Sequence, residues 1–123
     1  MAVVSRQLTL NITISSTWKQ MIQGHGGAAY LAPSSGSNPR ADVKLLRALN
    51  LSSGSTQVEF AFSSASTIAD DQYVVVRRTM QGYGIFNDDS VHVLRTGEGI
   101  WARLINSAGS PNVTLRASLL EVS

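Results

Sequence analysis

Residues 7–15 read QLTLNITIS, and four aliphatic side chains alternate there with polar ones. Successive side chains of a β-strand point to opposite faces, so this alternation predicts a strand with one buried and one solvated face. The side chains expected on the buried face are Leu8, Leu10, Ile12 and Ile14. A strand of this kind needs partner strands, and the rest of the chain supplies candidates.

Further aliphatic stretches recur between turns rich in Gly, Ser, Pro and Asp. Additional strands are expected at residues 28–32, 42–51, 56–63, 73–79, 90–96, 100–106 and 112–122. Residues 42–51 also fit a helix, although we favour a strand, and residues 16–23 have the spacing of one or two helical turns. Short strands at regular intervals predict an all-β fold: a single antiparallel β-sandwich, jelly-roll-like, with about seven to nine short strands in one domain spanning residues 1–123.

The composition indicates a protein that is partly covered by other protein. Hydrophobic residues make up 43% of the 123 residues, and charged residues make up 15%. Soluble domains usually have about 25% charged residues, so part of this surface is expected to be an interface. The formal net charge is only +2, and the basic residues are scattered apart from the adjacent Arg77 and Arg78. Without a basic run, we expect no nucleic-acid partner.

Several function classes are excluded or disfavoured. The chain has no cysteine, which excludes disulfides and thiolate-bound metals. It shows no signal peptide and no apolar stretch approaching 18 residues, so no membrane partner is expected. The motif G-x-G-x-x-A occurs at residues 24–29 and 97–102, but dinucleotide binding needs a strand before it and a long helix after it. Pro33 closely follows the first match and a predicted strand follows the second, so we expect no cofactor.

The polar side chains show little organisation for catalysis. The acids near expected turns are Asp70, Asp71, Asp88 and Asp89, and His92 lies close to the second pair. Aspartate is a common turn residue, so a structural role is preferred, with a calcium site left as an alternative. His25 and His92 are the histidines, and the chain has no G-x-S-x-G nucleophile motif to accompany them. We therefore expect a protein without enzymatic activity.

Both faces of several predicted strands contain apolar side chains. In residues 97–105, GEGIWARLI, Trp101 and Arg103 share one face, opposite Ile100 and Leu104. A solvated sheet face should be polar throughout, whereas Trp and Arg are the residues that dominate interface hot spots. The residues expected to form a protein interface are Trp101, Arg103, Arg77, Arg78, Arg116, Trp18 and Tyr30.

The order of short strands, the segment GEGIWARL followed by a Gly/Ser/Pro turn, and a closing strand that ends in LLEV resemble small virion proteins of tailed bacteriophages. The resemblance covers mainly residues 73–123 and is to jelly-roll capsid cement, or decoration, proteins and related head or tail accessory domains. It implies a β-sandwich that forms dimers or trimers and docks over the joints between capsid subunits. It implies no catalytic residues.

The leading hypothesis is thus a structural virion protein, assembled in the host cytoplasm, whose partners are further copies of itself and the major capsid protein or another virion protein. The alternative is a tail-fibre or receptor-binding module that recognises a glycan, because exposed aromatic rings can stack on sugars. The aromatic residues considered for such a platform are Trp18, Tyr30, Tyr83 and Trp101.

Overall fold

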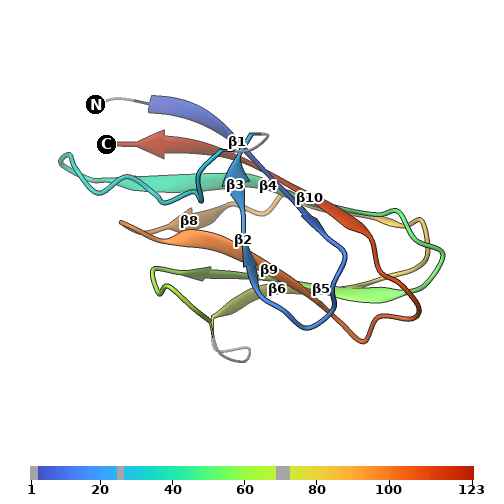
Figure 1. Ribbon diagram of the computed structural model, residues 1–123. Helices are drawn as coiled ribbons and strands as arrows, with labels where there is room; N and C mark the ends of the chain where they lie inside the picture. Colours follow the sequence, from blue (N-terminus) through green and yellow to red (C-terminus); the bar gives the residue numbers. More distant parts are fainter. Residues whose placement is uncertain (1–2, 25–26, 69–72) are drawn as a thin grey trace.

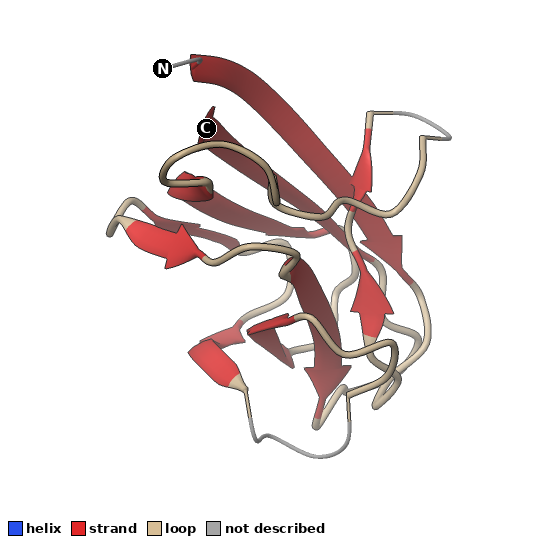
Figure 2. Ribbon diagram, turned by 90° about the vertical axis from the view of Figure 1, so that its left-hand side faces the viewer, coloured by secondary structure: helices blue, strands red, loops and turns tan. Residues whose placement is uncertain are grey.

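A computed structural model describes residues 3–24, 27–68 and 73–123, and these residues form ten β-strands and no helix. The strands pack as two antiparallel sheets, one on the other (Figures 1 and 2). Their bounds are β1 (Val3–Ile12), β2 (Lys19–Gln20), β3 (Ile22–Gln23), β4 (Arg40–Asn50), β5 (Thr56–Ser63), β6 (Val74–Met80), β7 (Ile85–Asp88), β8 (His92–Leu94), β9 (Gly99–Ile105) and β10 (Val113–Val122). The predicted all-β sandwich is confirmed.

The larger sheet has the order β3-β1-β10-β4-β7, with β8 also paired to β4, and we call it the large sheet. The small sheet has the order β2-β9-β5-β6. In the large sheet β10 lies between β1 and β4, and it pairs with β1 over ten residues, from Val3 opposite Val122 to Ile12 opposite Val113. The first and last strands of the chain are therefore neighbours (Figure 1).

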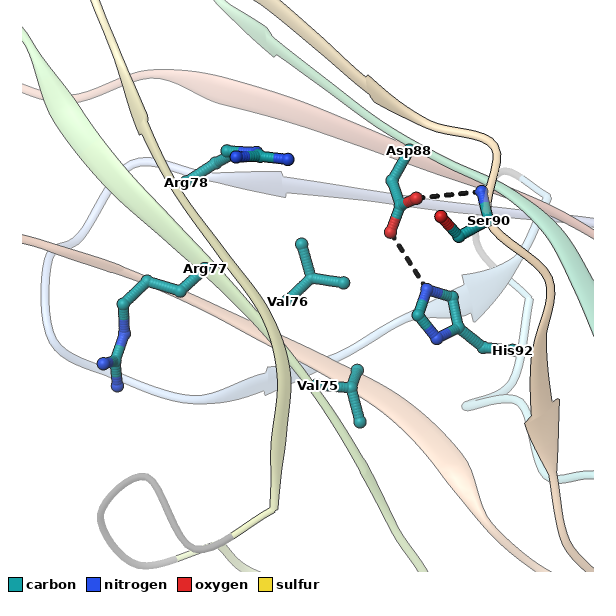
Figure 3. A pocket seen from close by; sticks show the side chains of 7 residues that line it. All are labelled: Val75, Val76, Arg77, Arg78, Asp88, Ser90 and His92. Atoms are coloured by element: carbon teal, nitrogen blue, oxygen red, sulfur yellow. Dashed lines mark hydrogen bonds and ion pairs between the residues drawn. The ribbon is translucent and has the colours of Figure 1, made fainter.

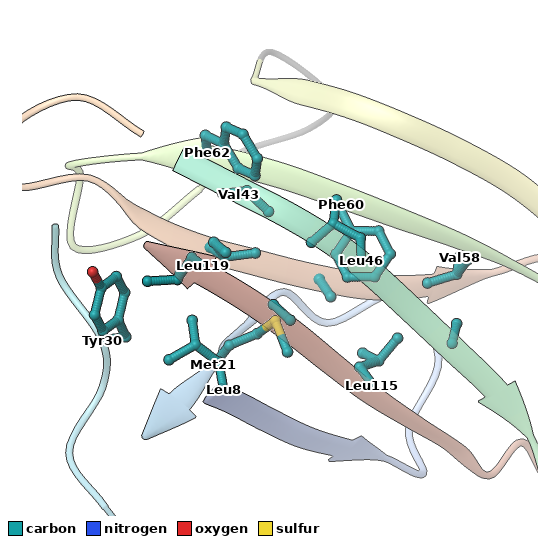
Figure 4. Packing of buried hydrophobic residues seen from close by; sticks show 14 of the residues in the cluster. Leu8, Met21, Tyr30, Val43, Leu46, Val58, Phe60, Phe62, Leu115 and Leu119 are labelled. Atoms are coloured by element: carbon teal, nitrogen blue, oxygen red, sulfur yellow. The ribbon is translucent and has the colours of Figure 1, made fainter. Parts of the chain in front are cut away.

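The core lies between the inner faces of the two sheets (Figure 4). The alternation in β1 places Leu8 and Ile12 there, and β10 contributes four side chains at every second position. The small sheet supplies Phe60 and Leu104 from the opposite side. The inward residues of β10 are Val113, Leu115, Ala117 and Leu119. Ile14 lies beyond the end of β1 and is exposed, so its predicted inward orientation is wrong.

Strand β4 contains a β-bulge. Ser118 of β10 is opposite Leu45, but Leu119 is opposite Val43, so Lys44 has no partner in the register. The extra residue lets Val43 and Leu46 both point into the core although they are three positions apart. The preference for a strand over residues 42–51 is confirmed.

Residues 16–23 form no helical turn, contrary to the sequence prediction. Strand β2 pairs with β9 in the small sheet, and β3 pairs with β1 in the large sheet, so this segment passes from one sheet to the other. Met21 lies between them, buried, with its backbone N–H donating to the carbonyl of Ile100 at 2.8 Å. Pairing with β9 and then with β1 determines the conformation of this segment, rather than the helical spacing of its apolar residues.

Three further boundaries differ from prediction. Residues 28–32 form only an isolated bridge, from Ala29 to Ile22, and Ala32 exchanges backbone hydrogen bonds with the turn at residues 97–98. The expected turn at residues 87–89 overlaps β7, which pairs with β4. The strand expected at residues 90–96 is limited to β8. Among the described residues, no helix is long and apolar enough to span a membrane.

Replacing Leu46 with alanine tests the packing of the core. Leu46 is completely buried, so Leu46→Ala removes apolar contacts and leaves a cavity, and we expect the free energy of unfolding to fall by about 2–5 kcal/mol. The same change at Leu31, which is 55% exposed, should cost less than about 0.5 kcal/mol. Urea denaturation of both variants measures the difference, and equal losses would contradict the assigned core.

Candidate interface on the outer face of the small sheet

The outer face of the small sheet is organised around one buried carboxylate, that of Glu59 on β5. Glu59 is directly opposite Arg103 of β9 on one side and Arg77 of β6 on the other. Nε of Arg103 donates to Oε1 of Glu59 at 2.6 Å, and Nε of Arg77 donates to Oε2. Each carboxylate oxygen thus has its own guanidinium, which compensates for removing Glu59 from water.

Trp18 extends this cluster across the edge of the sheet. The loop before β2 lies against β9, because Ser15 Oγ donates to the carbonyl of Leu104 at 3.1 Å and the backbone N–H of Ser16 donates to the same oxygen. The loop brings the Trp18 ring to 4.6 Å from the guanidinium carbon of Arg103, a cation–π contact. Arg103 is therefore held both by Glu59 and by Trp18.

Trp101 lies two positions before Arg103 on β9 and faces the same way. Its side chain is mostly buried, at 8% exposure, and its indole Nε1 has no hydrogen-bond partner in the described part of the chain. A buried donor without an acceptor costs about 1–3 kcal/mol. Trp101 also borders a cavity of about 450 Å³. The other described residues lining this cavity are Ser16, Thr17, Trp18, Thr67, Ile68 and Arg103.

Arg78 points away from this cluster, because it follows Arg77 on β6 and consecutive residues of a strand face opposite sides. Its guanidinium carbon lies 5.3 Å from the centre of the Phe86 ring. It borders a second cavity, between β6 and the β7–β8 edge, in which Asp88 Oδ2 lies 2.9 Å from His92 Nε2 (Figure 3). Burial opposes ionisation of Asp88, but hydrogen bonds from His92 and Ser90 outweigh it and lower its pKa.

The remaining predicted interface residues lie elsewhere. Arg116 projects from the outer face of the large sheet. Tyr30 is completely buried, and its hydroxyl donates to Oε2 of Glu121 at 2.6 Å. Burial raises the pKa of that hydroxyl, and the negative charge of Glu121 raises it further. The structure therefore brings Trp18, Arg77, Trp101 and Arg103 into one cluster, separate from Arg78, Arg116 and Tyr30.

The sequence analysis did not identify Glu59, although it organises the cluster. Its position between Val58 and Phe60 in an alternating strand marks it as an outward residue, but only the strand order places it between two arginines. Within residues 3–24, 27–68 and 73–123, no group of three or more His, Asp or Glu side chains is arranged to hold a metal. His25 and the Asp70–Asp71 pair lie outside the described residues. The glycine motif at residues 97–102 leads into β9, as expected.

Comparison with known proteins finds a similar fold among solved structures. No family model matches the sequence, and no curated protein matches it. Among solved structures, the chain is similar to a chain of the acidic stable capsid of Helicobacter pylori bacteriophage KHP30. The TM-score is 0.59 at 12% sequence identity, and the match covers 99% of this chain and 98% of the phage chain. The two chains share a fold. The predicted resemblance to bacteriophage virion proteins is confirmed as a fold shared with a phage capsid chain.

Substitutions in the Glu59 cluster should differ strongly in how much they lower the free energy of unfolding. Glu59→Gln leaves two arginines facing a neutral group, and we expect the free energy of unfolding to fall by about 3 kcal/mol. Arg77→Gln should cost less than about 1 kcal/mol, because the Arg77 side chain is 45% exposed and Glu59 keeps Arg103. Chemical denaturation of both variants tests this order, and an equal cost would show that Glu59 is not the centre of the cluster.

Proposed function

We propose that the chain is a non-enzymatic structural virion protein, most specifically a phage capsid cement or decoration subunit. The observation that carries this proposal is the shared fold with a phage capsid chain, which extends over nearly the full length of both chains. The low content of charged residues, 15%, supports a protein whose surface is partly covered by others. The proposed location is the assembled particle, with assembly in the host cytoplasm.

The proposed mechanism is the burial of additional surface at the joints between capsid subunits. A standard specific contact buries about 1,600 Å² in total, and repetition by the symmetry of a shell multiplies many modest contacts. The Trp18–Arg103–Trp101 region is our first choice for a contact with another virion protein or with a second copy. Its residue types are those of interface hot spots, and Trp101 Nε1, which is buried without a partner, would gain one if docking opened the site to an acceptor of the partner protein.

A second candidate function, binding of a glycan, rests on the same cavity. Two tryptophans and the hydroxyl side chains of Ser16, Thr17 and Thr67 border it, and sugar recognition combines aromatic rings with hydrogen-bonding groups. The capsid function is preferred to glycan binding because it also accounts for the fold match, which covers the whole sandwich rather than one cavity.

The first experiment asks whether the chain is part of the particle. Purified particles of the phage that encodes the chain are analysed by quantitative mass spectrometry, and the isolated protein is analysed by light scattering across a range of concentrations. We expect many copies per particle and a dimer or trimer in solution. Absence from purified particles would overturn the virion role. A monomer at every concentration would remove self-assembly from the proposal and leave the major capsid protein as the partner.

Trp101→Phe tests the proposed contact without leaving a large cavity at position 101. It removes the indole N–H but keeps an aromatic ring, so we expect the free energy of unfolding to change by less than about 1.5 kcal/mol. If a partner accepts a hydrogen bond from Trp101, co-sedimentation with shells that lack the protein should weaken about tenfold, the equivalent of roughly one hydrogen bond. Tyr83→Phe is the control, since Tyr83 is 70% exposed and distant in sequence from the cluster. Equal binding of both variants would remove Trp101 from the contact.

A further inference from the structure

The outer face of the large sheet carries a pair of arginines that nothing in the described protein neutralises. Arg116 of β10 and Arg47 of β4 are directly opposite each other in the register. Thr9 continues this row on β1, and Asn87 continues it on β7, so the row contains no acid. Side chains directly opposite in an antiparallel pair have Cβ atoms about 4.5–5.5 Å apart, and like charges at that distance are unfavourable.

Four other arginines of the sheets have an acidic partner, whereas Arg78 lies over the Phe86 ring instead. Arg6 pairs with Glu121 at 3.0 Å, and Arg40 pairs with Asp42 at 3.1 Å. On the small sheet, Arg103 and Arg77 share the carboxylate of Glu59. Arg47 and Arg116 are both exposed, and neither forms an ion pair or hydrogen bond with its side chain among the described residues. Their mutual repulsion is therefore uncompensated within the chain.

The surroundings of the pair provide a shaped, partly apolar surface. A shallow cavity of about 310 Å³ lies between Arg47, Leu49, Thr114 and Arg116. The next row of the sheet runs from Thr114 to Leu49 and on to Ile85, which is 56% exposed. Two guanidiniums thus border a row that holds the hydroxyl of Thr114 and the aliphatic side chains of Leu49 and Ile85. Such a surface offers bidentate hydrogen bonds to carboxylates and apolar contact to the rest of an extended chain.

We propose that this Arg47–Arg116 surface docks an acidic, extended segment of another virion protein. The inference rests on the proposed function, because a subunit that sits over a joint must contact its neighbours through more than one face. The small sheet provides one outer face, where Arg77 and Arg103 share the carboxylate of Glu59. The large sheet provides the opposite outer face, whose charges require carboxylates from a partner.

The chemistry favours this occupant over two others. A second copy docked by a two-fold axis that passes through the pair would bring arginines against arginines. A nucleic acid is recognised through many phosphate contacts, whereas this face offers two adjacent cations in a chain of net charge +2. Two neighbouring carboxylates on one side of an extended segment match the two arginines and the aliphatic side chains beside them.

The test uses the full-length ¹⁵N-labelled protein and a ten-residue peptide of alternating Glu and Thr, with the Gln–Thr peptide as the uncharged control. Binding is followed through amide chemical shifts. We expect the shift changes to lie on β4 and β10 around Arg47 and Arg116, and the Kd to rise by about tenfold or more in Arg47→Gln/Arg116→Gln. Lys19→Gln/Arg95→Gln removes the same charge elsewhere and should change the Kd less than about twofold. Higher salt should weaken binding, since the pair is exposed.

The folding of the variant is checked by its thermal unfolding temperature. Each Arg→Gln change relieves repulsion between like charges, so the double variant should unfold at the same temperature as the wild type or higher. Shift changes elsewhere, no shift changes at millimolar peptide, or equal weakening in the two double variants would overturn the proposed surface. A thymidine oligonucleotide that binds the same residues more tightly than the peptide would also overturn it, in favour of a nucleic acid.

The shell experiment separates this inference from the proposed function. If the wild-type protein binds shells and Arg47→Gln/Arg116→Gln binds them equally well, the surface is wrong and the virion role stands. If the protein is absent from particles while the Glu–Thr peptide binds at Arg47 and Arg116, the virion role is wrong and the acidic-segment surface stands.

Discussion

The structure depends on the position of β10 between β1 and β4. Ten register pairs join β10 to each neighbour, so a strand from the end of the described chain fixes both the first long strand and the middle one. This pairing decides which side chains face the small sheet and which face away. Leu115, Ala117 and Leu119 enter the core because β10 is central, and Arg116 between them must then lie on the outer face. The surface chemistry of the large sheet is thus a consequence of how its core is filled.

Local alternation predicted β1, and aliphatic stretches between turns predicted β5, β9 and β10. The failures occur where a contact between distant segments determines the conformation. Residues 16–23 pair first with the small sheet and then with the large sheet. The bulge at Lys44 shifts by one position which residues of β4 point into the core. Neither the sheet change nor the bulge leaves a local signal, because both depend on partners far along the chain.

The same limit applies to the candidate site. Trp101, Arg103 and Trp18 were selected by residue type, and strand order brought them together. Glu59 carries no distinguishing sequence context, yet the order β9-β5-β6 places it between two arginines. Conversely, Tyr30 was selected as an aromatic residue for a surface and is buried. Residue type indicated what an interface would contain, but only the register could show which side chains are neighbours and which charges are already satisfied.

The two outer faces handle charge in opposite ways, and this contrast is informative about assembly. On the small sheet the buried carboxylate of Glu59 binds two guanidiniums, so both arginines have an acidic partner within the chain. On the large sheet two adjacent guanidiniums have no carboxylate, although the chain pairs Arg6 and Arg40 with acids nearby. A monomer that functions alone would be more stable with one of those arginines replaced. An unfavourable pair at the centre of a sheet is understandable if a partner supplies the missing carboxylates, because the repulsion that weakens the free subunit then becomes part of the driving force for docking.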